Sequence, residues 1–254
     1  MTTVFSIFAG IDGGLTWILR PASAAAPLQA RVEHTVRMPS VEPLLRPGAT
    51  FNLTADEAAE NVWFKVPDWL AGTWSMRREA TVYHQDFRTG KVTTDRKEFE
   101  AHTSFTYGHQ RDREGGFWHY VGTPYTSRTE LADFVEYHQV SEKELVQSDE
   151  KRAVIRTRVT VIRTDTATNT IVRTFQQESI TTYTRLSRDE LKLTSSTKVF
   201  DDTGQAAAVV ENEGVVHRMS PFTETDFASA KNLKELFVHF LLSHQLANLI
   251  PDQL

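Results

Sequence analysis

Hydrophobic and polar residues alternate in short runs from Gly72 to about residue 218. In a strand, alternate side chains point to opposite faces, so one set of each run is expected to face the interior of a sheet. In the first run this set comprises Trp74, Met76, Arg78, Ala80 and Val82. Later runs, several of them rich in β-branched residues, predict strands at 99–107, 117–121, 131–140, 153–163, 171–186, 191–200 and 206–218. Short polar turns separate the runs. The pattern therefore predicts a mainly β fold, an antiparallel up-and-down meander whose closure into a barrel would remove its exposed edges.

The segment before this pattern is different. Residues 1–65 contain five of the nine prolines of the chain, and proline restricts both itself and its predecessor. We therefore expect an irregular N-terminal extension. It is interrupted by a short helix at 54–63, where Thr54 and Glu57 have the spacing of a capping box.

The segment after it changes period once more. Between residues 233 and 244, apolar residues recur at intervals of three and four, which is the pattern of an amphipathic helix. This helix is predicted to begin near Asp226 and to end before Pro251. The chain is thus divided into an N-terminal extension (1–65), a β-barrel domain (66–220) and a C-terminal segment (221–254) whose helix packs on the barrel.

Composition excludes several classes of function. The 254 residues are 40% hydrophobic and 24% charged, with a formal net charge of -5 and no cysteine. Disulfides, thiolate zinc sites, iron–sulfur clusters and a cysteine nucleophile are therefore excluded. Basic residues form no stripe, so we expect no nucleic-acid partner. No apolar run approaches the roughly 20 residues of a membrane-spanning helix, so we expect no integral membrane protein.

The first residues have some features of an export signal. An apolar stretch from Val4 to Leu19 precedes the small residues Ala24 to Ala26, which resemble a signal-peptidase site within a degenerate signal segment at 1–26. However, no basic residue precedes Arg20, and Asp12 interrupts the stretch. The sequence leaves the location open between the cytoplasm and export.

The start of the first long strand carries a short motif. Gly72-Thr73-Trp74, preceded by Trp69-Leu70-Ala71, resembles the Gly-x-Trp motif of the calycin superfamily, which includes lipocalins and fatty-acid-binding proteins. The resemblance covers about residues 66–220 and implies a lipocalin-like barrel that binds an apolar ligand. It also implies that the tryptophan packs across one end of the barrel under an arginine from a late strand, either Arg185 or Arg218. The N-terminal 65 residues and the absence of a disulfide depart from the family pattern.

Other chemistry has little support in the sequence. There is no G-x-S-x-G elbow, P-loop or G-x-G-x-x-G, so no catalytic residue is assigned and the sequence favours a protein that is not an enzyme. The histidines show no H-x-H or H-x-x-x-H spacing, and no metal site is predicted. The superfamily resemblance adds one cofactor alternative, haem ligated inside the barrel by His217.

Aromatic residues give the strongest indication of a site. Several cluster in the sequence on neighbouring predicted strands, where they form either the core or the lining of an apolar ligand cavity. The predicted ligand-binding residues are Trp74, Phe105, Tyr107, Trp118, Tyr120 and Arg185. On the C-terminal helix, an apolar face formed by Phe237, Phe240 and Leu241 could instead contact a protein partner.

Three functions follow from these features. The favoured one is non-enzymatic binding of a small apolar molecule in the barrel, because barrels of about eight strands can hold one ligand. The first alternative is a structural or interaction domain with a filled barrel that uses the C-terminal helix. The second is an enzyme or chaperone on a calycin scaffold, as in the bilin lyases.

Overall fold

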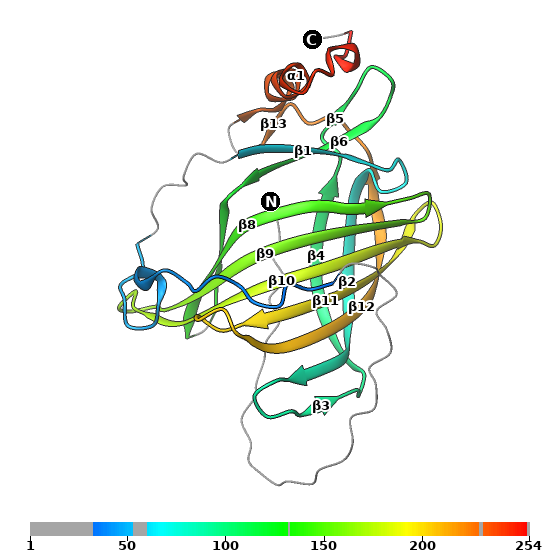
Figure 1. The fold of residues 1–254 in the computed structure, drawn as a ribbon. Coiled ribbons are helices and arrows are strands. Elements are labelled where there is room, and N and C mark those ends of the chain that lie inside the picture. Colours follow the sequence, from blue (N-terminus) through cyan, green and yellow to red (C-terminus); the bar gives the residue numbers. More distant parts are fainter. Residues whose placement is uncertain (1–32, 53–59, 132, 229–230, 253–254) are drawn as a thin grey trace.

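The computed structural model describes residues 33–52, 60–131, 133–228 and 231–252. It is mainly β, with one α-helix near the C-terminus (Figure 1). The strands are β1 (Glu60–Val66), β2 (Gly72–Asp86), β3 (Val92–Thr93), β4 (Lys97–Tyr107), β5 (Gln110–Arg111), β6 (Phe117–Thr123), β7 (Tyr125–Glu130), β8 (Phe134–Ser148), β9 (Arg152–Asp165), β10 (Ile171–Arg185), β11 (Glu190–Phe200), β12 (Ala206–Pro221), β13 (Phe227–Ala228) and β14 (Lys231–Asn232). The helices are α1 (Leu233–Ser243) and the 3-10 turns η1 (Pro43–Leu45) and η2 (Ala247–Leu249).

The predicted antiparallel meander is confirmed. Strands β7 to β12 pair with their neighbours in sequence order, and β2 then pairs with β12. The free edge of β2 is extended by β3 and β4. The long strands curve together and enclose a concave face (Figure 1). Within the described residues, however, the edge strands β4 and β7 do not pair with each other, so the closed barrel of the prediction is not formed by hydrogen bonds.

A second, smaller sheet contains β5 and β6, the strands that follow β4 in the sequence. It has the order β1-β6-β5. Because β5 and β6 connect β4 to β7 in the sequence, this small sheet lies across the open side of the large sheet, where β1 and β6 contact β8 (Figure 1). Helix α1 packs on the opposite face of the small sheet, where Trp63, Trp118 and Phe237 share one hydrophobic cluster.

Two helix predictions are corrected. Residues 60–63 belong to β1 rather than to a helix, and 54–59 lie outside the described residues. The C-terminal helix begins at Leu233, not near Asp226, because the Asn232 side chain accepts hydrogen bonds from the amides of Lys234 and Glu235 and so caps the first turn. The helix also packs on the small sheet rather than directly on the long strands.

The described N-terminal segment lies along the convex face of the large sheet. The amide and hydroxyl of Thr35 donate to the buried carboxylate of Glu178 at 2.6 and 3.0 Å. Arg158 also binds this carboxylate, at 3.3 Å. The same face also has a small hydrophobic cluster, in which Phe51 of the N-terminal segment packs on Ile162. Two other hydrophobic clusters of the large sheet lie on the concave face.

Strand β2 departs from the simple alternation that its sequence suggests. Its pairing with β4 shifts register between Met76 and Arg78, and its pairing with β12 shifts near the same point. A β-bulge moves the following side chains to the other face. Trp74 and Met76 are buried as predicted, but Arg78 is exposed and Glu79 is buried in its place. The predicted inward position of Arg78 was therefore wrong.

Candidate functional site

One end of the concave face is built from the Gly-x-Trp segment. Gly72 has φ +133°, and a Cβ atom there would lie 2.6 Å from an Arg218 nitrogen and 2.7 Å from the Ser220 carbonyl oxygen. Only glycine fits such a close approach of backbone and side chain. Trp74 is fully buried and donates its indole N–H to the Leu70 carbonyl at 2.8 Å. The turn before β2 is thereby tied to the first long strand.

Of the two arginines that the resemblance offers, Arg218 lies on Trp74. Its guanidinium carbon is 4.1 Å from the ring centroid, and the group donates to the carbonyls of Ala71 and Trp69 at 2.7 and 2.9 Å. Arg185 is exposed at the end of β10. The assignment of Arg185 as a ligand-binding residue is therefore not supported by its position.

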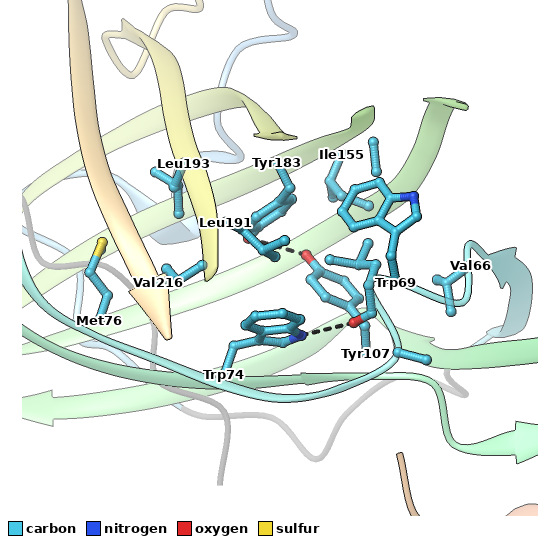
Figure 2. Close-up of a cluster of buried hydrophobic side chains, with 13 residues drawn as sticks. Val66, Trp69, Trp74, Met76, Tyr107, Ile155, Tyr183, Leu191, Leu193 and Val216 are labelled. Carbon is cyan, nitrogen blue, oxygen red and sulfur yellow. Dashed lines mark hydrogen bonds between the residues drawn. The ribbon is translucent and has the colours of Figure 1, made fainter. Parts of the chain in front are cut away.

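An aromatic cluster extends from this end along the concave face (Figure 2). The hydroxyl of Tyr107 on β4 lies 3.4 Å from that of Tyr183 on β10, within hydrogen-bond distance. The ring of Phe105 packs against both, 5.6 Å from Tyr107 and 5.4 Å from Tyr183. Three predicted site residues, Trp74, Phe105 and Tyr107, are therefore brought together in one cluster.

The other two predicted aromatics lie elsewhere. Trp118 and Tyr120 face helix α1, on the opposite side of the small sheet from the concave face. The Trp118 indole donates to the Asp112 carboxylate at 2.8 Å, and the Tyr120 hydroxyl donates to Asn61 at 2.8 Å. The structure thus separates them from the Tyr107 cluster, because β6 turns its even-numbered side chains toward α1.

The middle of the concave face is polar, which the sequence analysis did not anticipate. Cross-strand pairing places Lys143, Thr157, Ser179 and Thr197 in one row across β8 to β11. The hydroxyls of Ser179 and Thr197 are hydrogen-bonded at 2.9 Å. Beyond this row the face becomes apolar again, with Val140, Val159, Val161, Phe175, Val199 and Ala208. A polar belt therefore lies between two hydrophobic clusters.

Lys143 is the cation of this belt. Its Nζ atom lies 5.2 Å from the centroid of the Tyr107 ring. Among the described residues, no carboxylate lies within ion-pair distance of it. Burial lowers the pKa of Lys143 to about 8, since the charged form is poorly solvated there.

Two stacked imidazoles lie beside it, beneath the small sheet. The rings of His109 and His119 are parallel at 4.6 Å, and His119 also contacts Tyr107 at 5.0 Å. Burial is the main reason that the pKa of His109 falls to about 4 and that of His119 falls well below its ordinary value, and Lys143 lowers both further. Both rings are therefore neutral at pH 7. The His109 Nδ1 accepts from the Tyr120 amide, whereas the His119 Nδ1 has no partner within the described chain.

The bulge in β2 adds a buried carboxyl group. Glu79 shares a cross-strand row with Gly214, Leu193 and Tyr183. It is 2% exposed, and neither of its oxygens has a hydrogen-bond partner among the described residues, although the Asn212 amide lies beside it. Burial raises the pKa of Glu79 to about 7. The group is thus partly protonated at neutral pH.

The position of His217 does not support the haem alternative. Ligation inside a barrel needs an inward histidine, but the His217 side chain is 60% exposed and lies 3.4 Å from the Glu190 carboxylate at the surface. Across the part of the chain that the structure describes, no three His, Cys, Asp or Glu residues are grouped so as to hold a metal ion.

Comparisons with known proteins give no further guide. A scan of protein-family models, a search of curated proteins and a search of solved structures each find no match to this chain. None of the described helices has the length and apolar character needed to cross a membrane.

Proposed function

We propose that this protein binds a small, largely apolar molecule on the concave face of its large sheet, beneath the small sheet. One observation carries the proposal. In the middle of this face, Lys143, Thr157, Ser179 and Ser195 point inward from neighbouring strands, yet all remain only half-buried. The described side chains therefore leave accessible surface inside the fold.

The lining is suited to such a ligand. Binding sites for small molecules are mostly apolar and aromatic, with a few polar groups that orient the ligand. Here the two hydrophobic clusters provide the apolar surface, and the belt around Lys143 provides the polar groups. The buried pair of Tyr107 and Tyr183 adds two hydroxyl groups at the edge of the belt.

We further propose that the fold is a lipocalin-like barrel in which the small sheet completes the wall between β4 and β7. Support comes from the segment that suggested the resemblance. Because Gly72 has no Cβ atom, the Arg218 side chain can approach the backbone there and lie on the Trp74 ring. An arginine on this tryptophan is the arrangement that the calycin resemblance implies.

The interaction-domain alternative has less support. Phe237 and Leu241 are 1% and 0% exposed, because the small sheet already covers this face of α1. A protein partner at these residues would have to displace β1 and β6. No described group of residues forms a catalytic motif of the kind that the enzyme alternative requires, so simple binding is the function proposed.

A fluorescence titration tests the proposal. The uncharged probe N-phenyl-1-naphthylamine is added to the purified protein, and a rise in its emission reports an apolar site. Ser195→Trp fills the middle of the concave face and is expected to weaken binding at least tenfold. Lys192→Trp, on the same strand but exposed on the convex face, is the matched control and is expected to bind normally.

Two results would contradict the proposal. One is no probe binding by the unmodified protein, and the other is equal binding by both tryptophan variants. Native mass spectrometry and an absorbance spectrum of the purified protein complement the titration, since a co-purifying mass or chromophore identifies the class of ligand directly.

A further inference from the structure

We propose that Lys143 is a covalent attachment site for apolar aldehydes or ketones, which form a reversible imine with its Nζ atom. This inference rests on the proposed function, because the carbonyl compound must first enter the concave face. It goes further by assigning a reaction and a class of ligand to one residue.

Lys143 has no ion pair, unlike three other lysines among the described residues. Lys65, Lys192 and Lys234 lie 3.2 to 3.3 Å from carboxylates. The acidic residues on either side of Lys143 in the sequence form ion pairs with arginines instead. Glu142 binds Arg158 at 2.7 Å, and Glu144 binds Arg156 at 2.9 Å. A nearby carboxylate would stabilise the ammonium form. Its absence favours the neutral amine, which is the form that attacks a carbonyl group.

The amine is also accessible from inside the fold. Lys143 is half-buried, and it shares its cross-strand row with the half-buried hydroxyl residues Thr157 and Ser179. These inward side chains keep some surface that water can reach, so the row around Lys143 is not sealed by the core. By contrast, Glu79 is completely enclosed and is not a comparable site.

No group facing Lys143 holds it in the charged form. The titratable groups that face Lys143 are Tyr107 on β4, His109 between β4 and β5, and His119 on β6. Both imidazoles are neutral at pH 7, and burial raises the pKa of Tyr107 well above its ordinary value. With a pKa of about 8, roughly one Lys143 in ten is a neutral amine at pH 7, against about one in three thousand for an ordinary lysine.

The reaction needs no other reagent. The Nζ lone pair forms a C–N bond to the carbonyl carbon, and the carbonyl oxygen takes up a proton as nitrogen loses one, giving a carbinolamine. A second proton transfer to this hydroxyl group releases water, and nitrogen loses its remaining proton as the C=N bond forms. The sum is one amine and one aldehyde giving one neutral imine and one water, with no oxidation or reduction. The hydroxyls of Thr157 and Ser179 lie in the row where these proton transfers take place.

The class of carbonyl compound follows from the flanking surfaces. Along the concave face, the Tyr107–Tyr183 cluster lies on one side of the Lys143 row, and the Val140–Phe175 cluster lies on the other. Most of the surface on both sides is aliphatic or aromatic, and a charged group at the second cluster, Arg163 beside the Phe175 ring, is already paired with Glu136. An aromatic or long-chain aldehyde therefore fits better than a sugar or a small polar aldehyde.

Reductive trapping of the intact protein tests the inference. Limiting 2-naphthaldehyde and sodium cyanoborohydride are added at pH 7, and labelled lysines are identified by peptide mass mapping. We expect Lys143 to be labelled at least tenfold faster than the exposed Lys97 and the ion-paired Lys192. Excess N-phenyl-1-naphthylamine is expected to slow labelling at Lys143 alone. Lys143→Arg, which keeps a charged chain but cannot form the imine, is expected to lose the fast phase.

The outcomes separate this inference from the proposed function. If the naphthylamine probe binds but Lys143 is labelled no faster than Lys97, the imine site is wrong and the binding function stands. If the probe does not bind while Lys143 is labelled selectively, the proposed non-covalent function is wrong. Because the main readout uses the unmodified protein, poor folding of a variant does not affect the conclusion.

Discussion

The guanidinium carbon of Arg218, on the last long strand, lies over the Trp74 ring of the first, 4.1 Å from its centroid. The N–H groups of this guanidinium also donate to the carbonyls of Trp69 and Ala71, in the turn that precedes β2. One side chain therefore connects the two ends of the meander with the segment that closes one end of the fold. These contacts anchor this end of the fold, whereas the ligand site that we propose lies in the middle of the concave face.

Arg218→Ala is expected to lower the free energy of unfolding by about 2–4 kcal/mol. The substitution removes a cation–π contact and leaves two carbonyl groups without their charged donor. Urea unfolding measures the effect, and Arg77→Ala, an exposed arginine on β2, is the matched control with an expected change below about 0.5 kcal/mol. Equal stability of the two variants would contradict the role given to Arg218.

Gly72→Ala is expected to destabilise the fold more than Gly90→Ala. Both glycines have positive φ, but a Cβ atom at Gly72 meets Arg218 and Ser220, whereas one at Gly90 has no atom within 4 Å. Gly90→Ala should cost only the backbone strain of about 1 kcal/mol, and Gly72→Ala should cost about 2 kcal/mol more. Similar thermal unfolding of the two variants would show that the close approach is not needed.

Glu79 is expected to make stability fall as pH rises from about 5 to 8. Burial raises the folded-state pKa to about 7 from an ordinary value of 4.5, so the folded state binds the proton more tightly than the unfolded state. The stabilising contribution is fully present below pH 4.5 and is lost as pH rises through 7, by about 3 kcal/mol.

Glu79→Gln should remove this contribution, and urea unfolding at pH 5 and pH 8 measures it. The exposed Glu100→Gln is the matched control and should keep the decline of the unmodified protein. An unchanged difference between the two pH values in Glu79→Gln would show that the carboxyl group is not the source.

Lys143→Met is expected to stabilise the protein at pH 7 by about 1–2 kcal/mol. The folded-state pKa is lowered to about 8, so folding disfavours the ammonium form below that pH, and an apolar side chain of similar length avoids this cost. The gain should shrink as pH rises from 8 to 10. Destabilisation by Lys143→Met at pH 7 would indicate that the charge has a partner in the folded protein.

Phe237→Ala is expected to destabilise the protein by about 3–5 kcal/mol, because its ring is buried against Trp63 and Trp118 at 4.8 and 5.7 Å. Leu242→Ala, on the exposed side of the same helix, should change stability by less than about 0.5 kcal/mol. Chemical unfolding compares the two. If Phe237→Ala were neutral, its helix face would be free for another partner.

Elements that depend on local pattern could be predicted from the amino-acid sequence. The alternation of apolar and polar residues identified most of the long strands and their order, and the three- and four-residue spacing identified the C-terminal helix. It also singled out Trp74, Phe105 and Tyr107, which the structure brings together. These features follow from periodicity, which neighbouring residues specify on their own.

Which side chains come into contact depends on how distant strands pair, and this could not be predicted from the sequence. The bulge that turns Glu79 inward exists because β2 must pair with β4 and β12 at once, and a shift of one residue exchanges the two faces. The small sheet directs Trp118 and Tyr120 toward α1 and His119 toward Tyr107. Lys143 becomes a buried amine without an acid partner through the pairing of distant strands, and no local pattern encodes that pairing.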